Sequence, residues 1–255
     1  MMRHLPGLFA VLVLLLSGCA PRGTRPPLAT PDQFPADFPL ADYERAAGRG
    51  EPVYRIDPTA SEIRVLVYRG GALARLGHNH VIVSRNVHGY ILAGPFPEGQ
   101  RADLAIPVSR LIVDDPIARQ EAGEGFEYAL EPQAIESTTA NMLGEAVLDA
   151  QRYPFITAHA RPRTALGPAT LPVHVEIQIH GVTRGFDLTA HTERSSDGLL
   201  VSGTMELRQS DFGITPFSIL GGALRVQDRV VVHFRLLAKP YSDFSRVRGP
   251  QTPSG

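Results

Sequence analysis

The sequence lacks several features that define common functional classes. Its 255 residues include no tryptophan and one cysteine, which excludes an intrachain disulfide framework and a cysteine-rich metal cluster. The net charge is −1, so no basic excess favours a nucleic-acid partner. No Gly-x-Ser-x-Gly motif occurs, and no serine stands in a recognisable catalytic motif. We therefore expect a protein that is not an enzyme.

The longest apolar run near the start, residues 8–16, is too short to cross a bilayer, which takes roughly 20 residues. It ends in Leu16-Ser17-Gly18-Cys19, which resembles the lipobox of bacterial lipoproteins. The resemblance implies a signal peptide over residues 1–18 and lipidation of Cys19, which would anchor the protein to a membrane. Because Ala20 follows the cysteine, it also implies a periplasm-facing lipoprotein of the outer membrane. An ordinary secretory signal with a chance cysteine is the alternative.

The composition divides the rest of the chain into three parts. Residues 19–50 contain six prolines and few aliphatic side chains, so we expect a semi-extended tether, with a short helix between Asp37 and Arg45. Residues 51–239 form the predicted domain. Residues 240–255 are polar and are predicted to be a flexible tail.

The predicted domain is dominated by a period of two, which is typical of strands with one face toward a core. About eight such strands favour an all-β fold, either a closed barrel or a sandwich, and we expect an eight-stranded antiparallel lipocalin-like barrel. The apolar sets that predict inward faces include Ile63, Val65 and Val67; Val81, Val83 and Val87; Leu104, Ile106 and Val108; Val173, Val175, Ile177 and Ile179; and Val230, Val232, Phe234 and Leu236.

Residues 116–150 break this alternation and are predicted to be a short helical insert. A helix is expected from Pro132 to Leu143, because proline is favoured in the first turn and Gly144 stands just past the end. Its apolar face is weak, so we expect it to cover an edge or an end of the sheet.

Four motifs, taken in order, resemble the YceI-like family of polyisoprenoid-binding or lipid-binding proteins. They are Tyr54-Arg55-Ile56-Asp57-Pro58, the segment 148–157 with Tyr153-Pro154, His180-Gly181-Val182-Thr183-Arg184, and Ser210-Asp211-Phe212-Gly213-Ile214. The resemblance covers roughly residues 52–238. It implies a lipocalin-like barrel of eight antiparallel strands with a helix, non-catalytic binding of an isoprenoid or lipid-like chain in the interior, and possible pairing of two copies as a homodimer.

The expected binding site combines apolar and polar side chains. The apolar strand faces suit an apolar guest, and Phe212 and Phe234 are predicted to point inward. Phe217 lies in the apolar loop 215–222, which could form a lid over the opening or a packed hairpin connection. Tyr90 is assigned to the site because its even number places it on the face of His80 in a continuous strand.

The stretch Leu76-Gly77-His78-Asn79-His80 is where the chain departs from the family's commoner pattern. In an extended segment His78 and His80 point to the same side. They could bind the polar head of a guest, hydrogen-bond loop carbonyls, or supply two ligands of a metal site whose third ligand would be His159, His180 or His233. The metal reading gives the alternative function, a metal- or haem-associated periplasmic protein linked to membrane electron transfer. A purely structural envelope module with a filled barrel is the third class.

Overall fold

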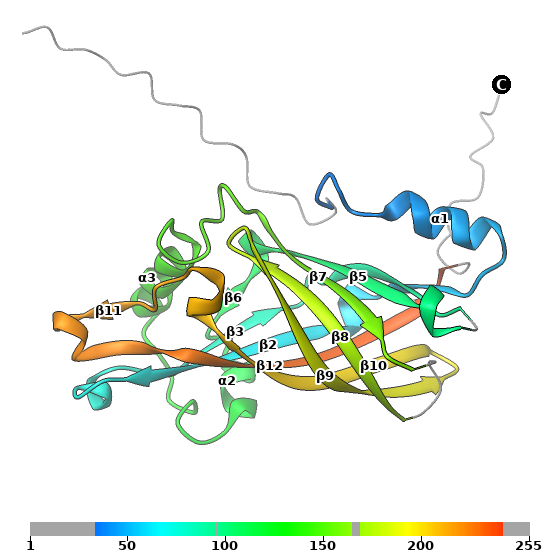
Figure 1. Ribbon diagram of the computed structural model, residues 1–255. Helices are drawn as coiled ribbons and strands as arrows, with labels where there is room; N and C mark the ends of the chain where they lie inside the picture. The colour runs from blue at the N-terminus through cyan, green and yellow to red at the C-terminus, as the bar shows by residue number, and fades with distance from the viewer. Residues whose placement is uncertain (1–33, 95, 165–168, 242–255) are drawn as a thin grey trace, which may run out of the picture.

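The alternating apolar sets form antiparallel strands that close into a barrel, seen in a computed structural model (Figure 1). The structure describes residues 34–94, 96–164 and 169–241. The strands are β1 (Val53–Ile56), β2 (Glu62–Gly70), β3 (His80–Ser84), β4 (His88–Leu92), β5 (Arg101–Pro107), β6 (Ile112–Val113), β7 (Phe155–Pro162), β8 (Thr170–Ile179), β9 (Val182–Ser195), β10 (Gly198–Arg208), β11 (Ser218–Ile219) and β12 (Leu224–Pro240). The helices are α1 (Leu40–Gly48), α2 (Pro116–Ala122) and α3 (Pro132–Leu143).

Eight strands make the closed ring, which confirms the predicted barrel. The order around the wall is β1-β4-β5-β7-β8-β9-β10-β12, and β12 pairs back to β1 with Tyr54 opposite Pro240. β2 also pairs with β12, and β3 and β6 follow it in the sheet, so these three strands lengthen the wall on that side. A closed wall satisfies the backbone hydrogen bonds that an open sheet would leave at its edges.

Three neighbouring strands of the wall are each broken into two pieces. The pieces are β1 and β2, β3 and β4, and β5 and β6. Asp57 ends β1 by capping the short 3₁₀ turn that begins at Pro58. The Leu237 amide of β12 donates to the Ser61 hydroxyl at 3.0 Å, which ties the broken strand to its neighbour. Pro107 ends β5, because proline cannot donate to the next rung of the ladder.

The break between β3 and β4 changes which residues face inward. Ile82 and Ser84 line the barrel interior, whereas Val81 and Val83 lie on the outer face. The prediction that those two valines face the interior is therefore wrong. They are completely buried all the same, because α2 and Phe126 cover this part of the outer wall.

The helical insert agrees with the predicted one and contains a second helix. α3 spans Pro132–Leu143 as expected, and its last turn brings Met142 to one end of the barrel interior. The additional helix α2 begins at Pro116, where the Asp115 carboxylate accepts the Ala118 amide at 2.9 Å. The sequence predicts only the helix from Pro132 to Leu143 in this segment, and α2 is an addition to it.

The short helix expected between Asp37 and Arg45 is present as α1, which covers Leu40–Gly48 at the end of the predicted tether. α1 packs on the outer wall, where Tyr43 and Ala46 are buried against Val53 and Tyr90. None of the helices in the described ranges is long and apolar enough to span a membrane. The predicted signal peptide, Cys19 and the tail from residue 242 lie outside the described residues.

Hydrogen bonds to the buried carboxylate of Asp103 fix α1 to the barrel. The Tyr43 hydroxyl donates to Asp103 of β5 at 2.6 Å, and His159 of β7 contacts the same carboxylate through Nδ1 at 2.6 Å. Burial, followed by the charge of Asp103, raises the pKa of Tyr43 well above its usual range. The hydrogen bond to Asp103 raises the pKa of His159. These contacts place Asp103 and His159 on the outer wall, away from the interior.

Candidate functional site: an apolar cavity along the barrel

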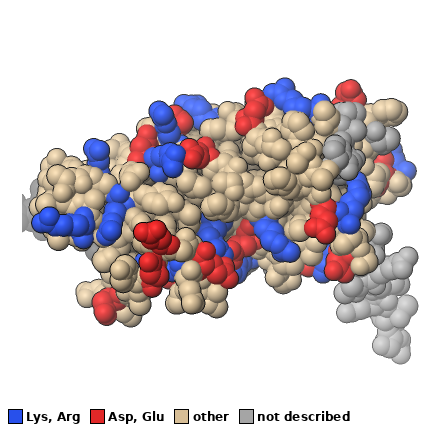
Figure 2. Space-filling model, turned by 90° about the horizontal axis from the view of Figure 1, so that it is seen from below, with Lys and Arg blue, Asp and Glu red and all other residues tan. Residues whose placement is uncertain are grey.

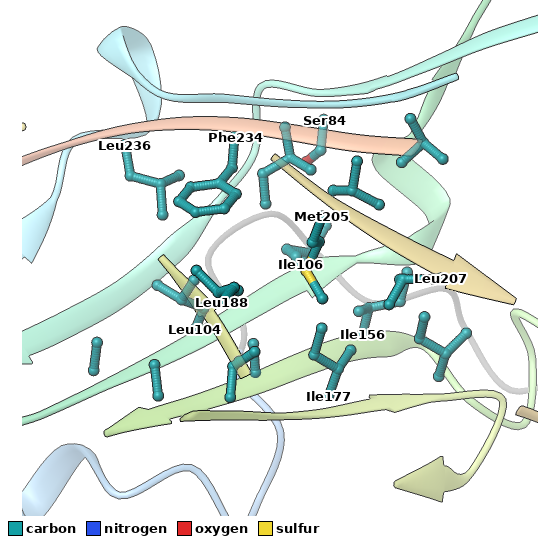
Figure 3. A pocket seen from close by; sticks show the side chains of 18 of the residues that line it. Ser84, Leu104, Ile106, Ile156, Ile177, Leu188, Met205, Leu207, Phe234 and Leu236 are labelled. Carbon is teal, nitrogen blue, oxygen red and sulfur yellow. The ribbon is translucent and has the colours of Figure 1, made fainter. Parts of the chain in front are cut away.

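The barrel interior is not filled by its own side chains. It contains a cavity of about 320 Å³, which is within the size range of small-molecule sites. Leu104, Met205 and Phe234 are only partly buried, because they border this space. Figure 3 shows the lining side chains pointing from opposite walls toward one another, and those labelled are Ser84, Leu104, Ile106, Ile156, Ile177, Leu188, Met205, Leu207, Phe234 and Leu236.

The cavity is long and narrow. β8 contributes every second residue from Leu171 to Ile179, so the lining continues over ~26 Å of strand at ~3.3 Å per residue. Small side chains make the space, because Ala102, Ala158 and Ala160 occupy neighbouring inward positions of β5 and β7. A guest that fits this shape is an extended chain rather than a compact ring system.

Polar groups are few and lie mostly at the two ends of the cavity. Gln100 and Arg101 line one end, and the Arg101 guanidinium contacts Asp42 of α1 at 3.1 Å. Arg208 and Gln209 line the other end, where β10 finishes. Between the ends Ser84 places a hydroxyl on the wall, where it accepts the amide of Asn86 at 3.4 Å. The cavity therefore offers an apolar channel with polar contacts at its mouths.

Two of the predicted aromatic residues line the cavity and two do not. Phe212 and Phe234 are part of the lining, as their inward prediction required. Tyr90 lies on the outer wall beneath α1, stacked on Tyr43 with ring centroids 5.2 Å apart. Counting every second residue from His80 fails here, because the break between β3 and β4 shifts the alternation and brings Ile91 inward instead.

Phe217 is the second predicted aromatic residue that does not reach the cavity. It is 44% exposed and stands just before β11, whose two residues pair with β12. The loop 215–222 therefore forms a hairpin that projects beyond the barrel. The lid is not observed.

The two histidines of the stretch 76–80 do not form a pair at the cavity. His80 Nδ1 lies 2.7 Å from Oδ2 of Asp114, a fully buried carboxylate whose Oδ1 accepts from Arg119 at 2.6 Å. His78 is exposed, and partial desolvation followed by the nearby charges of His80 and Arg119 lowers its pKa. Neither histidine lines the cavity. The two histidines therefore lie outside the apolar channel, where they do not meet the polar end of a guest in this cavity.

The candidate third ligands for a metal also lie apart. His159 is bound to Asp103 on the outer wall, and His233 contacts the Thr204 hydroxyl at 2.9 Å. His180 stands in the turn between β8 and β9, edge-on to Tyr153. Within the described residues no three His, Cys, Asp or Glu side chains are grouped as a metal site would need. No observation favours the metal or haem alternative.

Several lining residues were not predicted as site residues. Ala158 and Ala160 could have been found by continuing the alternation from Ile156 along β7. Val147 and Leu148 follow α3 and line the end of the cavity nearest to it, but their segment has no regular period that would reveal an inward face.

Comparison with known proteins agrees with this geometry. The model of the YceI-like domain matches residues 54–238, nearly the whole barrel. The search of curated proteins gives no match. The crystal structure of Burkholderia cenocepacia BcnA has a TM-score of 0.51 at 13% identity, covering 72% of this chain and 99% of that one. A Campylobacter jejuni YCEI protein gives 0.41 at 15% identity, covering 60% and 81%. The length of the domain match identifies the chain as a member of the YceI-like family.

Proposed function

We propose that the protein binds one long-chain apolar or amphiphilic molecule, isoprenoid or lipid-like, along the barrel axis. The observation that carries the proposal is the continuous apolar lining of a long and narrow cavity. Moving an apolar chain from water into such a lining is worth about 0.8 kcal/mol for each buried CH₂. Water molecules are poorly stabilised in this cavity, because a buried water needs two to four polar hydrogen-bond partners.

The proposed role is binding rather than catalysis. Acid–base or nucleophilic chemistry needs a reactive group within hydrogen-bond reach of a base. In the described part of the chain the cavity lining includes serine, threonine, glutamine and arginine as its polar side chains, but no histidine, aspartate or glutamate. Ser84 thus has no base beside it in the lining, and its hydroxyl is suited to orienting a guest.

The lipid content of the purified domain tests this function. The packing clusters of the described structure are formed by residues 34–241, so a chain of residues 20–255 keeps the folded unit without the predicted anchor. We expect its solvent extract to contain a long-chain compound close to one per protein, identified by mass spectrometry. An extract indistinguishable from that of an unrelated protein purified from the same cells would refute the proposal.

We also propose that the protein works at the cell envelope as a lipoprotein held by Cys19. The support is the apolar run 8–16 followed by Leu16-Ser17-Gly18-Cys19 in the sequence. Intact-mass measurement of the chain isolated from membranes is expected to give a mature protein that begins at Cys19 and carries acyl groups. A mature chain that starts elsewhere, or that has a free thiol at this position, would contradict the proposal.

A further inference from the structure

A two-hairpin arm projects from the end of the barrel at which Arg208 and Gln209 line the cavity. We define the arm as residues 69–77, the end of β2 and its turn, together with residues 215–227, which include β11 and the start of β12. Figure 1 shows β11 at the far left, beyond the barrel wall and at the opposite end from α1. The arm is thus an extension of one mouth.

The arm is held together by backbone contacts. Gly70 pairs with Arg225 across β2 and β12, and the Leu73 amide donates to the Ala223 carbonyl at 2.8 Å. Gly71 has φ +91°, and a Cβ at this position would lie 2.4 Å from the same carbonyl oxygen. The two hairpins therefore form a defined surface rather than two independent loops.

This surface exposes apolar side chains that nothing in the described structure covers. Large hydrophobic residues that are exposed number eight among the described residues, and half of them are on the arm: Leu76, Phe217, Ile219 and Leu220, between 44% and 67% exposed. Single exposed apolar residues are ordinary, but a group of this kind on one projection indicates an interaction surface.

The charges on the arm have one sign. The arm includes Arg69, Arg75 and Arg225 and no aspartate or glutamate. Figure 2 shows the left-hand tip in blue and tan without red, in the position of the arm in Figure 1. Basic and apolar side chains together are the combination that inserts at the boundary between head groups and acyl chains of an anionic bilayer.

The arm also continues directly into the cavity wall. Phe212 and Ile214 line the cavity, and Phe217 follows three residues later. On the other hairpin, Arg225 stands five residues before Val230, another lining residue. We propose that the arm docks on an anionic lipid bilayer, which would hold this mouth of the barrel at the membrane surface. This docking rests on the proposed function and extends it, because a mouth held at the bilayer surface lies next to the long-chain amphiphiles of the membrane.

Vesicle sedimentation of the chain of residues 20–255 tests the docking. We expect binding to phosphatidylcholine vesicles that contain about one third phosphatidylglycerol, weaker binding to phosphatidylcholine alone, and a decrease as salt rises. Each of the changes Arg75→Gln and Arg225→Gln should lower the partition coefficient about fivefold, as ~1 kcal/mol per basic residue implies. The pair Leu76→Ser and Leu220→Ser should lower it about tenfold.

Matched controls separate the arm from the general surface. Ile117 of α2 is 63% exposed, close to the 67% of Leu220, and Ile117→Ser should change binding less than about twofold. Arg161 is an exposed arginine of β7, and Arg161→Gln is the control for charge. Thermal unfolding of each variant must match the parent, since the altered side chains are exposed.

The proposal is overturned if zwitterionic and anionic vesicles bind equally, or if the arm variants bind as well as the controls. It is also overturned if the arm variants convert a dimer of the free chain to monomers in sedimentation velocity, because the surface would then be an interface between two copies. The guest content of the same samples is measured in parallel. If docking is lost and the guest is retained, only the docking proposal is refuted. If the guest is absent and docking is retained, only the proposed binding of a long-chain guest is refuted.

Discussion

Ala158→Phe is expected to reduce the guest content of the purified protein at least tenfold. Ala158 lies in register between Leu104 of β5 and Ile177 of β8, and all three line the cavity. A phenyl ring at this inward position occupies the space that an extended chain needs, in a cavity of only about 320 Å³. A tenfold loss of affinity corresponds to about 1.4 kcal/mol. This is a small part of the binding free energy that contact with a long apolar chain supplies. Quantitative mass spectrometry of solvent extracts measures the effect.

Gln178→Phe is the matched control for this blockage. Gln178 is the neighbour of Ile177 on β8 but points outward and is exposed, so the same ring is added to the same strand outside the cavity. Its guest content should equal that of the parent. Unfolding of the delipidated proteins should show Ala158→Phe no more than about 1–3 kcal/mol less stable, the usual range for added core volume. An unchanged guest content in a folded Ala158→Phe protein would show that the guest, if any, binds elsewhere.

Asp114→Ala is expected to lower the free energy of unfolding by about 3–5 kcal/mol at neutral pH, the usual effect of removing one partner of a buried ion pair. Its carboxylate accepts from Arg119 at 2.6 Å and from the Val81 amide at 2.9 Å, and it contacts His80. The change leaves the Arg119 guanidinium buried without its counter-charge. Such a loss is a large fraction of the 5–15 kcal/mol by which domains are stable. Urea unfolding measures it.

The pH dependence of this loss has a defined sign. Burial alone would raise the pKa of Asp114, but hydrogen bonds from His80 and the Val81 amide hold it below its usual value. A lowered folded pKa contributes stability above the unfolded pKa of about 3.9, and this contribution disappears as the pH falls through the folded value. The difference between parent and Asp114→Ala should therefore be largest at neutral pH and shrink below about pH 4.

Two further substitutions isolate the buried charge. Asp115→Ala removes the cap of α2 and a surface pair with Arg85, and should cost only about 1 kcal/mol. Asp114→Asn keeps a side chain that tolerates the positive φ of 56° at this position, so it separates the charge from the backbone strain that alanine adds. A loss under about 1 kcal/mol for Asp114→Ala would contradict the assigned role of the ion pair.

The barrel and α3 could be predicted because their signals are local. Alternating residues such as those of β8 face a core on one side only, and Pro132 and Gly144 mark the ends of a helix through backbone chemistry. Phe212 was also predicted to point inward, and it does so from the short 3₁₀ turn 209–212 that follows β10. These features depend on neighbours in the chain, so a single sequence contains them.

The errors in the site have a different origin. Tyr90 was predicted to face inward by counting every second residue from His80. The irregular residues between β3 and β4 shift this alternation, and no residue type in that segment signals the shift. One interpretation gave His80 the polar head of a guest, but its partner in the structure is Asp114, which is 34 residues away in the sequence. The docking of α1 likewise depends on Asp103, 60 residues from Tyr43. Contacts at such separations are set by the closed barrel and not by local pattern.

The pairing of β1 with β12 has a consequence for how the chain reaches its native state. The first and last strands of the barrel meet, with Tyr54 opposite Pro240, so the ring cannot close until almost the entire domain is available to fold. Until then the apolar inner face of a partial sheet has no opposite wall. Long-range closure of this kind slows folding and exposes sticky surface on the way. A chain that ends before β12 cannot form the ring, because β12 is the strand that pairs with both β10 and β1.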